Sequence, residues 1–135
     1  MESNRSGNVV LRVDLARALA EATDAARASE DRERLSGSLR DFIPEAFPHV
    51  KPGRPYKHNW HIDAVCAHLQ AVSDGHIERL QIWQPPGTMK SYAAHVMWPV
   101  WEWTRNPHLR YWCASHSLGL VWQHCGDSRT LIESE

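Results

Sequence analysis

The chain has 135 residues, of which 42% are hydrophobic and 23% are charged, a composition that suits one globular domain. The chain has fifteen Lys and Arg against sixteen Asp and Glu, a formal charge of −1. This charge excludes a strongly basic nucleic-acid-binding protein but is compatible with a local basic patch. No apolar run approaches the roughly 20 residues that span a bilayer, so we expect no membrane partner. Three cysteines without paired spacing argue against a disulfide framework and favour a reducing cytosol.

The N-terminal part of the chain differs in chemistry from the rest, because all seven tryptophans lie at or after residue 60. Residues 9–35 are rich in Ala, Leu, Arg and Glu, which favour helices. We therefore predict an N-terminal helical arm over residues 1–38, which packs on the rest of the protein or on a partner, and a second part over residues 39–135. The apolar stripe of this arm recurs at helical spacing: Leu11, Leu15, Leu19 and Ala22.

The second part alternates predicted helices and predicted strands. Strands that alternate with helices predict an α/β fold with a parallel sheet. In chain order the predicted elements are a short helix over 41–46 capped by Ser38, a helix over 60–73 capped by Asn59 and ended by Gly75, a strand over 79–83, a helix over 91–104 that Pro99 should end or kink near Trp98, a strand over 109–114 and a helix over 118–133.

The segment 84–91, with the sequence QPPGTMKS, lies between a predicted strand and a predicted helix, where a phosphate-binding loop is found. Amide groups at a helix N-terminus face an anion, the lysine reaches the outer phosphates and the hydroxyl contacts Mg²⁺. Lys90 and Ser91 fit the pattern G-x-x-x-x-G-K-[ST], whereas Gln84 and Met89 stand where its glycines would be. The alternative is a Pro-Pro-Gly turn that happens to contain a lysine.

Motifs on both sides of this loop occur in an order and at a spacing that resemble the N-terminal ATPase part of the large subunit of tailed-phage terminases. The resemblance covers about residues 39–135. It is carried by Asn59-Trp60-His61-Ile62-Asp63, Pro85-Pro86-Gly87-Thr88-Met89-Lys90-Ser91, Trp98-Pro99-Val100-Trp101-Glu102-Trp103, Ala114-Ser115-His116-Ser117 and Arg129-Thr130-Leu131-Ile132.

The resemblance implies a P-loop NTPase fold, present here in part, and an ATP-driven motor subunit that packages viral DNA in the cytoplasm of a bacterial host. It implies ATP and Mg²⁺ as cofactors, with Lys90 on the β- and γ-phosphates and Ser91 on Mg²⁺. Trp60 and His61 would lie near the adenine. The implied partners are double-stranded DNA, the terminase small subunit, the portal protein and further copies of the chain in a ring. The residues implied to bind the phosphates are Gly87, Thr88, Met89, Lys90 and Ser91.

The sequence also departs from the family. Gly87 stands where many members have Arg, and His116 where Tyr is more usual. The chain ends at Glu135, before the acidic second strand motif (Walker B) and the acidic cluster of the nuclease domain. Because hydrolysis needs a carboxylate to position water, we expect a truncated chain that binds nucleotide but hydrolyses it poorly alone. No catalytic residue is assigned.

Two other functions fit the sequence. The chain could be a prophage-derived interaction module with a vestigial nucleotide site, which acts through its N-terminal helix, or another P-loop ATPase of helicase type. Two clusters also have two interpretations each. The basic loop of Lys51, Arg54 and Lys57 is either a phosphate contact or a solvated surface. The tryptophans at 98, 101 and 103 either stack on bases or pack in the core.

Overall fold

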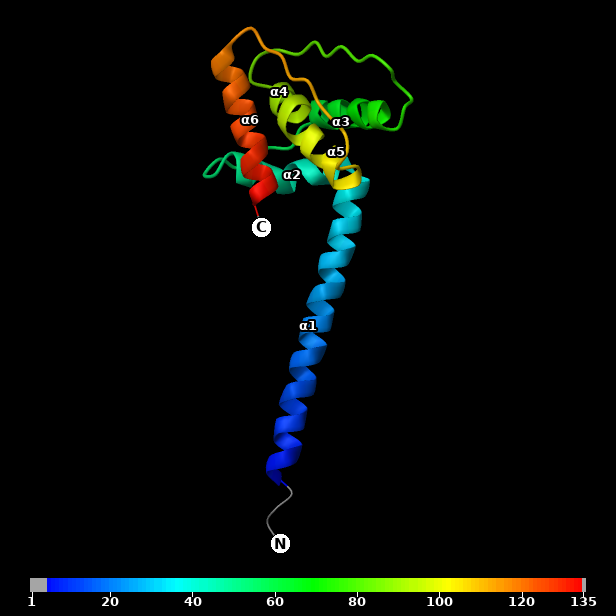
Figure 1. Ribbon diagram of the computed structural model, residues 1–135, viewed down its shortest axis with the longest axis vertical. Coiled ribbons are helices and arrows are strands. Elements are labelled where there is room, and N and C mark those ends of the chain that lie inside the picture. The colour runs from blue at the N-terminus through cyan, green and yellow to red at the C-terminus, as the bar shows by residue number, and fades with distance from the viewer. Residues whose placement is uncertain (1–4, 135) are drawn as a thin grey trace. The chain divides into compact units, whose positions relative to one another are not determined.

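The structure is a computed structural model that describes residues 5–134, with side chains described from residue 14 onward. Within that part the regular secondary structure is entirely helical (Figure 1). The elements are α1 (Arg5–Gly37), α2 (Leu39–Val50), α3 (Trp60–Ser73), α4 (Lys90–Tyr92), the π-helical segment η1 (Ala93–Met97), α5 (Trp98–Arg105) and α6 (Leu118–Glu133).

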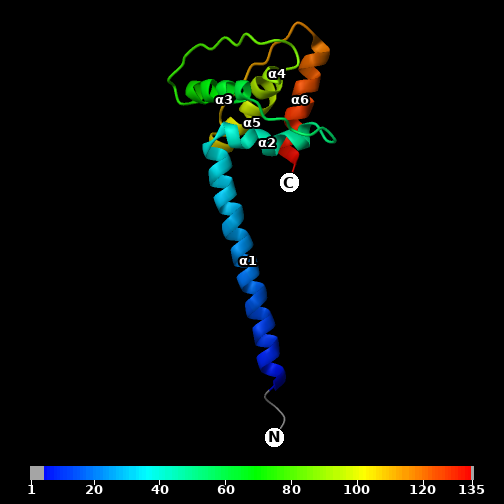
Figure 2. The same cartoon turned by 180° about the vertical axis from the view of Figure 1, so that it is seen from behind.

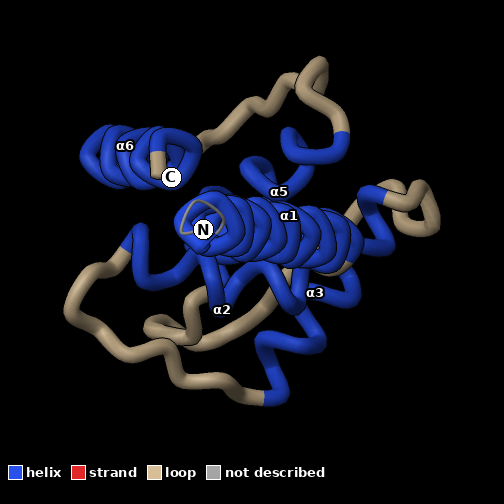
Figure 3. Tube along the Cα trace, turned by 90° about the horizontal axis from the view of Figure 1, so that it is seen from below, coloured by secondary structure: helices blue, strands red, loops and turns tan. Residues whose placement is uncertain are grey.

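The predicted parallel α/β sheet, and with it the P-loop NTPase fold, is wrong for the described residues, which form helices and loops without a strand (Figure 3). Residues 79–83 and 109–114, predicted as strands, are instead unpaired segments. A strand needs a neighbour at about 4.8 Å to pair its backbone groups. The apolar pattern of each segment favoured a strand, but no described segment lies where it could complete a ladder with either one.

The chain divides into two compact units between Arg34 and Leu35. The first unit contains most of α1, which confirms the predicted N-terminal helix, although the helix extends beyond the predicted 9–35 at both ends. Its described side chains are exposed, Leu15 and Leu19 at 59% and 60%. An ion pair one turn apart joins Arg17 to Glu21 at 2.9 Å, a contact of a few tenths of a kcal/mol on an exposed helix.

The second unit has its hydrophobic core between α2, α3, η1, α5 and the end of α6, which are seen from both sides in Figures 1 and 2. Trp101 of α5 is fully buried at the centre, and its indole N–H donates a 2.9 Å hydrogen bond to the Leu35 carbonyl. The other fully buried large side chains are Leu39, Ile43, Cys66, Val96 and Met97.

Local signals in the sequence correctly predicted the N-caps of α2 and α3 and the end of α3, although α2 is longer than the predicted 41–46. The Ser38 hydroxyl accepts a hydrogen bond from the Asp41 amide at 3.2 Å, and the Asn59 side chain accepts one from the Trp60 amide at 2.8 Å. Both residues have the extended backbone of a helix cap. Gly75 follows α3 with a φ of 75°, the left-handed conformation that glycine adopts at low cost.

The elements α4, η1 and α5 follow one another without a break from Lys90 to Arg105. Of the two predicted effects of Pro99, the helix does not end near Trp98, but the turn before Trp98 is distorted into a π-helix. Proline has no N–H to donate to the carbonyl of His95, and its ring clashes with that carbonyl in a regular α-helix. The preceding turn is therefore widened, and the Trp98 amide donates to the Ala93 carbonyl five residues back. No helix of the described residues is long and apolar enough to cross a membrane.

Candidate functional site

The loop that leads into α4 is closed by its own side chains. The Lys90 ammonium group donates a 2.6 Å hydrogen bond to the backbone carbonyl of Gln84. The Thr88 hydroxyl lies 2.9 Å from the Pro85 carbonyl and 3.1 Å from the Gln84 side-chain oxygen, so it can donate to either. The Lys90 side chain thus folds back over residues 84–89. From this position its ammonium group could contact an anion bound at the loop.

Two residues of this loop have a left-handed backbone. Gly87 has a φ of 83° and Met89 a φ of 62°, and Met89 is the one described residue other than glycine with a positive φ. A side chain in that conformation costs on the order of 1 kcal/mol. Met89 packs against the hydrophobic core, which offsets part of this cost. The structure therefore holds Met89 in a left-handed conformation, which a glycine adopts at lower cost.

A cavity of about 700 Å³ lies beside the loop. One wall is the loop and the start of α4, from Pro86 to Tyr92. The second wall comes from the end of α2 and the turn after it, with Lys51 and Arg54, and the third from α6. Three basic side chains, those of Lys51, Arg54 and Lys90, line the cavity. Such a concentration of positive charge in a concave site attracts anions.

Lys51 is held in place by two neighbouring groups, of which Tyr92 lines the cavity. Its ammonium nitrogen lies 3.4 Å from an oxygen of Asp127 on α6 and 4.6 Å from the centre of the Tyr92 ring. A hydrogen bond with Tyr92 raises the pKa of Lys51, and the Asp127 charge raises it further against the opposing effect of burial. Lys51 is therefore positively charged at neutral pH.

The wall formed by α6 carries polar groups that contact Tyr92. The Gln123 amide donates a 2.8 Å hydrogen bond to the Tyr92 hydroxyl. The His124 ring is almost fully buried, with ring centres 5.7 Å from Tyr92 and 5.5 Å from His95. Burial lowers the pKa of His95, and the neighbouring His124 lowers it further. Burial and the neighbouring imidazole therefore favour the neutral form of His95.

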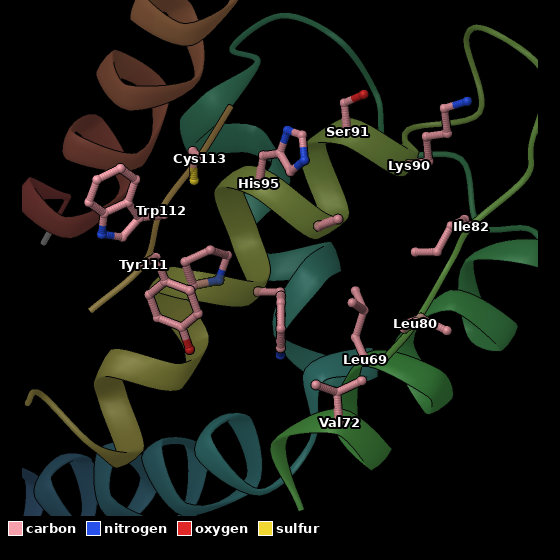
Figure 4. Close-up of a pocket in the computed structure, with 13 residues that line it drawn as sticks. Leu69, Val72, Leu80, Ile82, Lys90, Ser91, His95, Tyr111, Trp112 and Cys113 are labelled. Carbon is pink, nitrogen blue, oxygen red and sulfur yellow. The ribbon is translucent and has the colours of Figure 1, made fainter. Parts of the chain in front are cut away.

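A second cavity, of about 470 Å³, is largely apolar and lies between the two segments that were predicted as strands. Figure 4 shows Leu80 and Ile82 on one side of it and Tyr111 on the other, with Lys90 and Ser91 at its edge. The two segments thus lie on opposite sides of a cavity instead of pairing with each other. The start of α4 takes part in lining both cavities.

The structure brings together only part of the predicted site. Gly87, Thr88, Met89, Lys90 and Ser91 all line the 700 Å³ cavity. Trp60, 76% exposed, and His61 lie at the start of α3, where their rings meet edge to face, and neither lines a cavity at the loop. Their assignment to the adenine stays a prediction.

The contribution of α6 could not be read from the sequence. Leu120, Gln123 and His124 line the cavity, but they lie about 30 residues after the loop and match no nucleotide-binding pattern. For the basic loop of Lys51, Arg54 and Lys57, the sequence did not decide between a phosphate contact and a solvated surface. In the structure Lys51 and Arg54 line the cavity, whereas Lys57 is exposed outside it.

The tryptophans at 98, 101 and 103 pack inward, as the core interpretation predicts. Besides the buried Trp101, the indole N–H of Trp98 donates to the Ser73 hydroxyl at 2.8 Å and that of Trp103 to the Leu109 carbonyl at 2.9 Å. The rings of Trp98 and Trp103 both meet Tyr111 edge to face. Trp101 is buried, and Trp98 and Trp103 are half-buried and pack against the core.

A buried carboxylate lies beside these tryptophans. Glu102 is 9% exposed, and the Tyr111 hydroxyl donates a short hydrogen bond to it. Burial raises the pKa of Tyr111, and the hydrogen bond and charge of Glu102 raise it further. This contact ties the segment after α5 back onto the helix, and nothing in the sequence pattern indicated it.

Comparisons with known protein families, curated proteins and solved structures give no match to this chain. The likeness to terminases therefore rests on the motifs and their order, and the site on its own geometry.

Proposed function

We propose that this chain binds the polyphosphate of a nucleotide in the 700 Å³ cavity, with ATP as the ligand. The observation that carries the proposal is the closed loop itself. It has left-handed residues at 87 and 89, and Lys90 lies across it at the edge of a cavity of nucleotide size. A phosphate oxygen can replace the Gln84 carbonyl as the acceptor for the Lys90 ammonium group, and it makes a stronger, charge-assisted hydrogen bond.

Each residue of the loop has a distinct part in this proposal. Lys90 binds the outer phosphates, and Gly87 lets the backbone come close to the ligand because it has no side chain. The first amide groups of a helical segment have no acceptor within it, so those of Lys90 and Ser91 are available to an anion. Thr88 holds the loop closed through its hydroxyl group.

The residues present fit Mg²⁺ only together with the phosphates. Among residues 14–134, no group of three or more His, Cys, Asp or Glu side chains is placed to hold a metal ion. The hydroxyl of Ser91, which lines the cavity, is the protein ligand proposed for Mg²⁺. When bound, the ion neutralises charge on the phosphates.

We further propose DNA packaging as the process in which this binding is used. The support is the ordered set of motifs that resembles the terminase large subunit, from Asn59 to Ile132. On this proposal the partners are double-stranded DNA, the small subunit, the portal protein and further copies of the chain. The proposal concerns nucleotide binding by the described helical unit and does not require a sheet within it.

A second candidate function is that of an interaction module that acts through α1. Its support is the exposure of Leu15 and Leu19 on the same stripe of that helix. The two proposals predict different effects of replacing Lys90, because an interaction module does not need this lysine.

Binding of ATP with Mg²⁺ by calorimetry tests the proposal on the wild-type chain, Lys90→Ala and Lys57→Ala. Lys57 is a matched control because it is an exposed lysine that does not line the cavity. We expect Lys90→Ala to weaken binding by at least about tenfold, the effect of one charge-assisted hydrogen bond, and Lys57→Ala to leave it unchanged. Equal binding by all three folded proteins would rule out the loop as the phosphate site and favour the interaction module.

A further inference from the structure

The turn after α2 contributes charge to a cavity whose phosphate loop lies more than 30 residues away in the sequence. Lys51 and Arg54 stand on one wall and Lys90 on another. A single phosphate group can be bound by the basic side chains of one wall alone. Positive charges on two separate walls of a 700 Å³ cavity suit an anion with several phosphate groups along its length.

Lys51 differs from an ordinary surface lysine. Its side chain is only 25% exposed, and it points to the ring of Tyr92, which belongs to the helix that follows the phosphate loop. Arg54 of the same turn is exposed and lines the same cavity. Lys51, which is held by its neighbours, and the exposed Arg54 thus both line the cavity beside the loop. Lys57 of the same segment does not line it.

The Lys51 ammonium group pairs with the carboxylate of Asp127 at 3.4 Å. This distance is longer than the 2.7–2.9 Å of a close charge-assisted hydrogen bond. A phosphate oxygen can therefore compete for the ammonium group of Lys51. Because Asp127 belongs to α6, the same pair links the cavity to that helix.

We propose that Lys51 and Arg54 form a second phosphate-binding subsite of this cavity, so that the site takes a di- or triphosphate chain rather than a single phosphate. Lys90 binds one end of the chain, and Lys51 and Arg54 bind the other. Asp127 competes with the ligand for Lys51. This inference rests on the proposed nucleotide binding and extends it to the wall formed by the turn after α2.

Binding of two simple probes, tripolyphosphate and orthophosphate, tests the inference on the full chain without a base or sugar. We expect the wild-type protein to bind tripolyphosphate at least about tenfold more tightly than orthophosphate. Lys51→Gln should remove most of this preference, whereas Lys51→Arg, which keeps the charge, should keep it. Lys57→Gln is the control and should change neither affinity.

Asp127→Asn separates a role in binding from a role in folding. If Asp127 competes with the ligand, removing its charge strengthens tripolyphosphate binding by several-fold. If the Lys51–Asp127 pair only stabilises the fold, Asp127→Asn and Lys51→Gln both weaken binding and lower the melting temperature. That pattern, with Lys51→Arg failing to restore binding, would overturn the inference.

The outcomes also distinguish this inference from the proposed function. Loss of tripolyphosphate binding in Lys90→Ala, with wild-type binding in Lys51→Gln, would overturn the second subsite and leave the phosphate loop in place. Wild-type binding in both variants, with unchanged helical circular dichroism, would overturn both proposals. Loss in both, with Lys51→Arg restoring the preference for tripolyphosphate, is the result we expect.

Discussion

The ammonium group of Lys90 donates a 2.6 Å hydrogen bond to the carbonyl of Gln84, six residues before it. This contact closes the loop through side chain and backbone together. It also holds the charge at the edge of the cavity, where a phosphate group can take over from the carbonyl as the acceptor. The shape of the loop is therefore the feature on which the proposed binding depends most.

Gly87→Ala should strain this loop. Its φ of 83° disfavours any side chain, although a Cβ atom there would meet no neighbour within 4 Å. We expect the free energy of unfolding to fall by about 1 kcal/mol, or the loop to change conformation and lose ATP affinity. Urea unfolding and calorimetry of the same sample measure both effects.

The matched control for this change is Gly126→Ala, since Gly126 lies inside α6 and also has open space for a Cβ atom. Alanine favours a helix interior over glycine, so this variant should gain up to about 1 kcal/mol. The same substitution is thus expected to have opposite signs at the two positions. A gain in stability at both would mean that residue 87 does not require the left-handed conformation.

Tyr111→Phe should destabilise the second unit. The change keeps the ring between Trp98 and Trp103 but leaves the buried Glu102 carboxylate without its hydroxyl donor. The unpaired group should cost about 1–3 kcal/mol in urea unfolding. Tyr56→Phe removes a hydroxyl that makes only a long, exposed contact with His58, and it should cost far less. Equal losses in the two variants would contradict the structural role of the buried pair.

Stability should fall in alkaline solution partly because of Cys66. Burial raises the pKa of this thiol from its ordinary 9.0 to about 12. Above pH 9.0 the unfolded chain therefore releases a proton that the folded protein keeps. The stabilisation is complete below pH 9.0 and is lost as the pH rises toward 12, by about 1.4 kcal/mol per pH unit.

Cys66→Ala removes the contribution of this thiol to the pH dependence of the free energy of unfolding. The variant should begin less stable because of the small cavity that it creates, but its stability should fall less steeply with pH. Urea unfolding from neutral pH to about pH 11 gives the two slopes. Parallel slopes would show that the thiol ionises equally in the folded and unfolded chains.

The helices could be predicted from the sequence because their signals are local. Asn59, Ser38 and Gly75 act on backbone groups within a few residues, and each has the predicted part in the structure. The strands could not be predicted in this way. Residues 79–83 and 109–114 have suitable apolar patterns, but a strand also needs a partner segment, which a local pattern does not supply.

The candidate site could likewise be predicted only where its residues are contiguous in the sequence. The loop from Gly87 to Ser91 is a continuous segment, and it lines the cavity as a unit. Lys51 and Asp127, which are 76 residues apart, come together only through the packing of α2 and α6. Nothing in the sequence near either residue indicates the other, so the second wall of the cavity appears only in the folded chain.

The most direct test of phosphate binding by residues 87–91 is a titration of the isotope-labelled chain with ATP and Mg²⁺, observed through the backbone amide signals in NMR. We expect the signals of Gly87, Thr88, Lys90 and Ser91 to shift together and saturate, while those of α1 stay in place. Lys90→Ala should abolish these shifts. Saturable shifts confined to other segments, or none at all from a folded protein, would contradict phosphate binding by this loop.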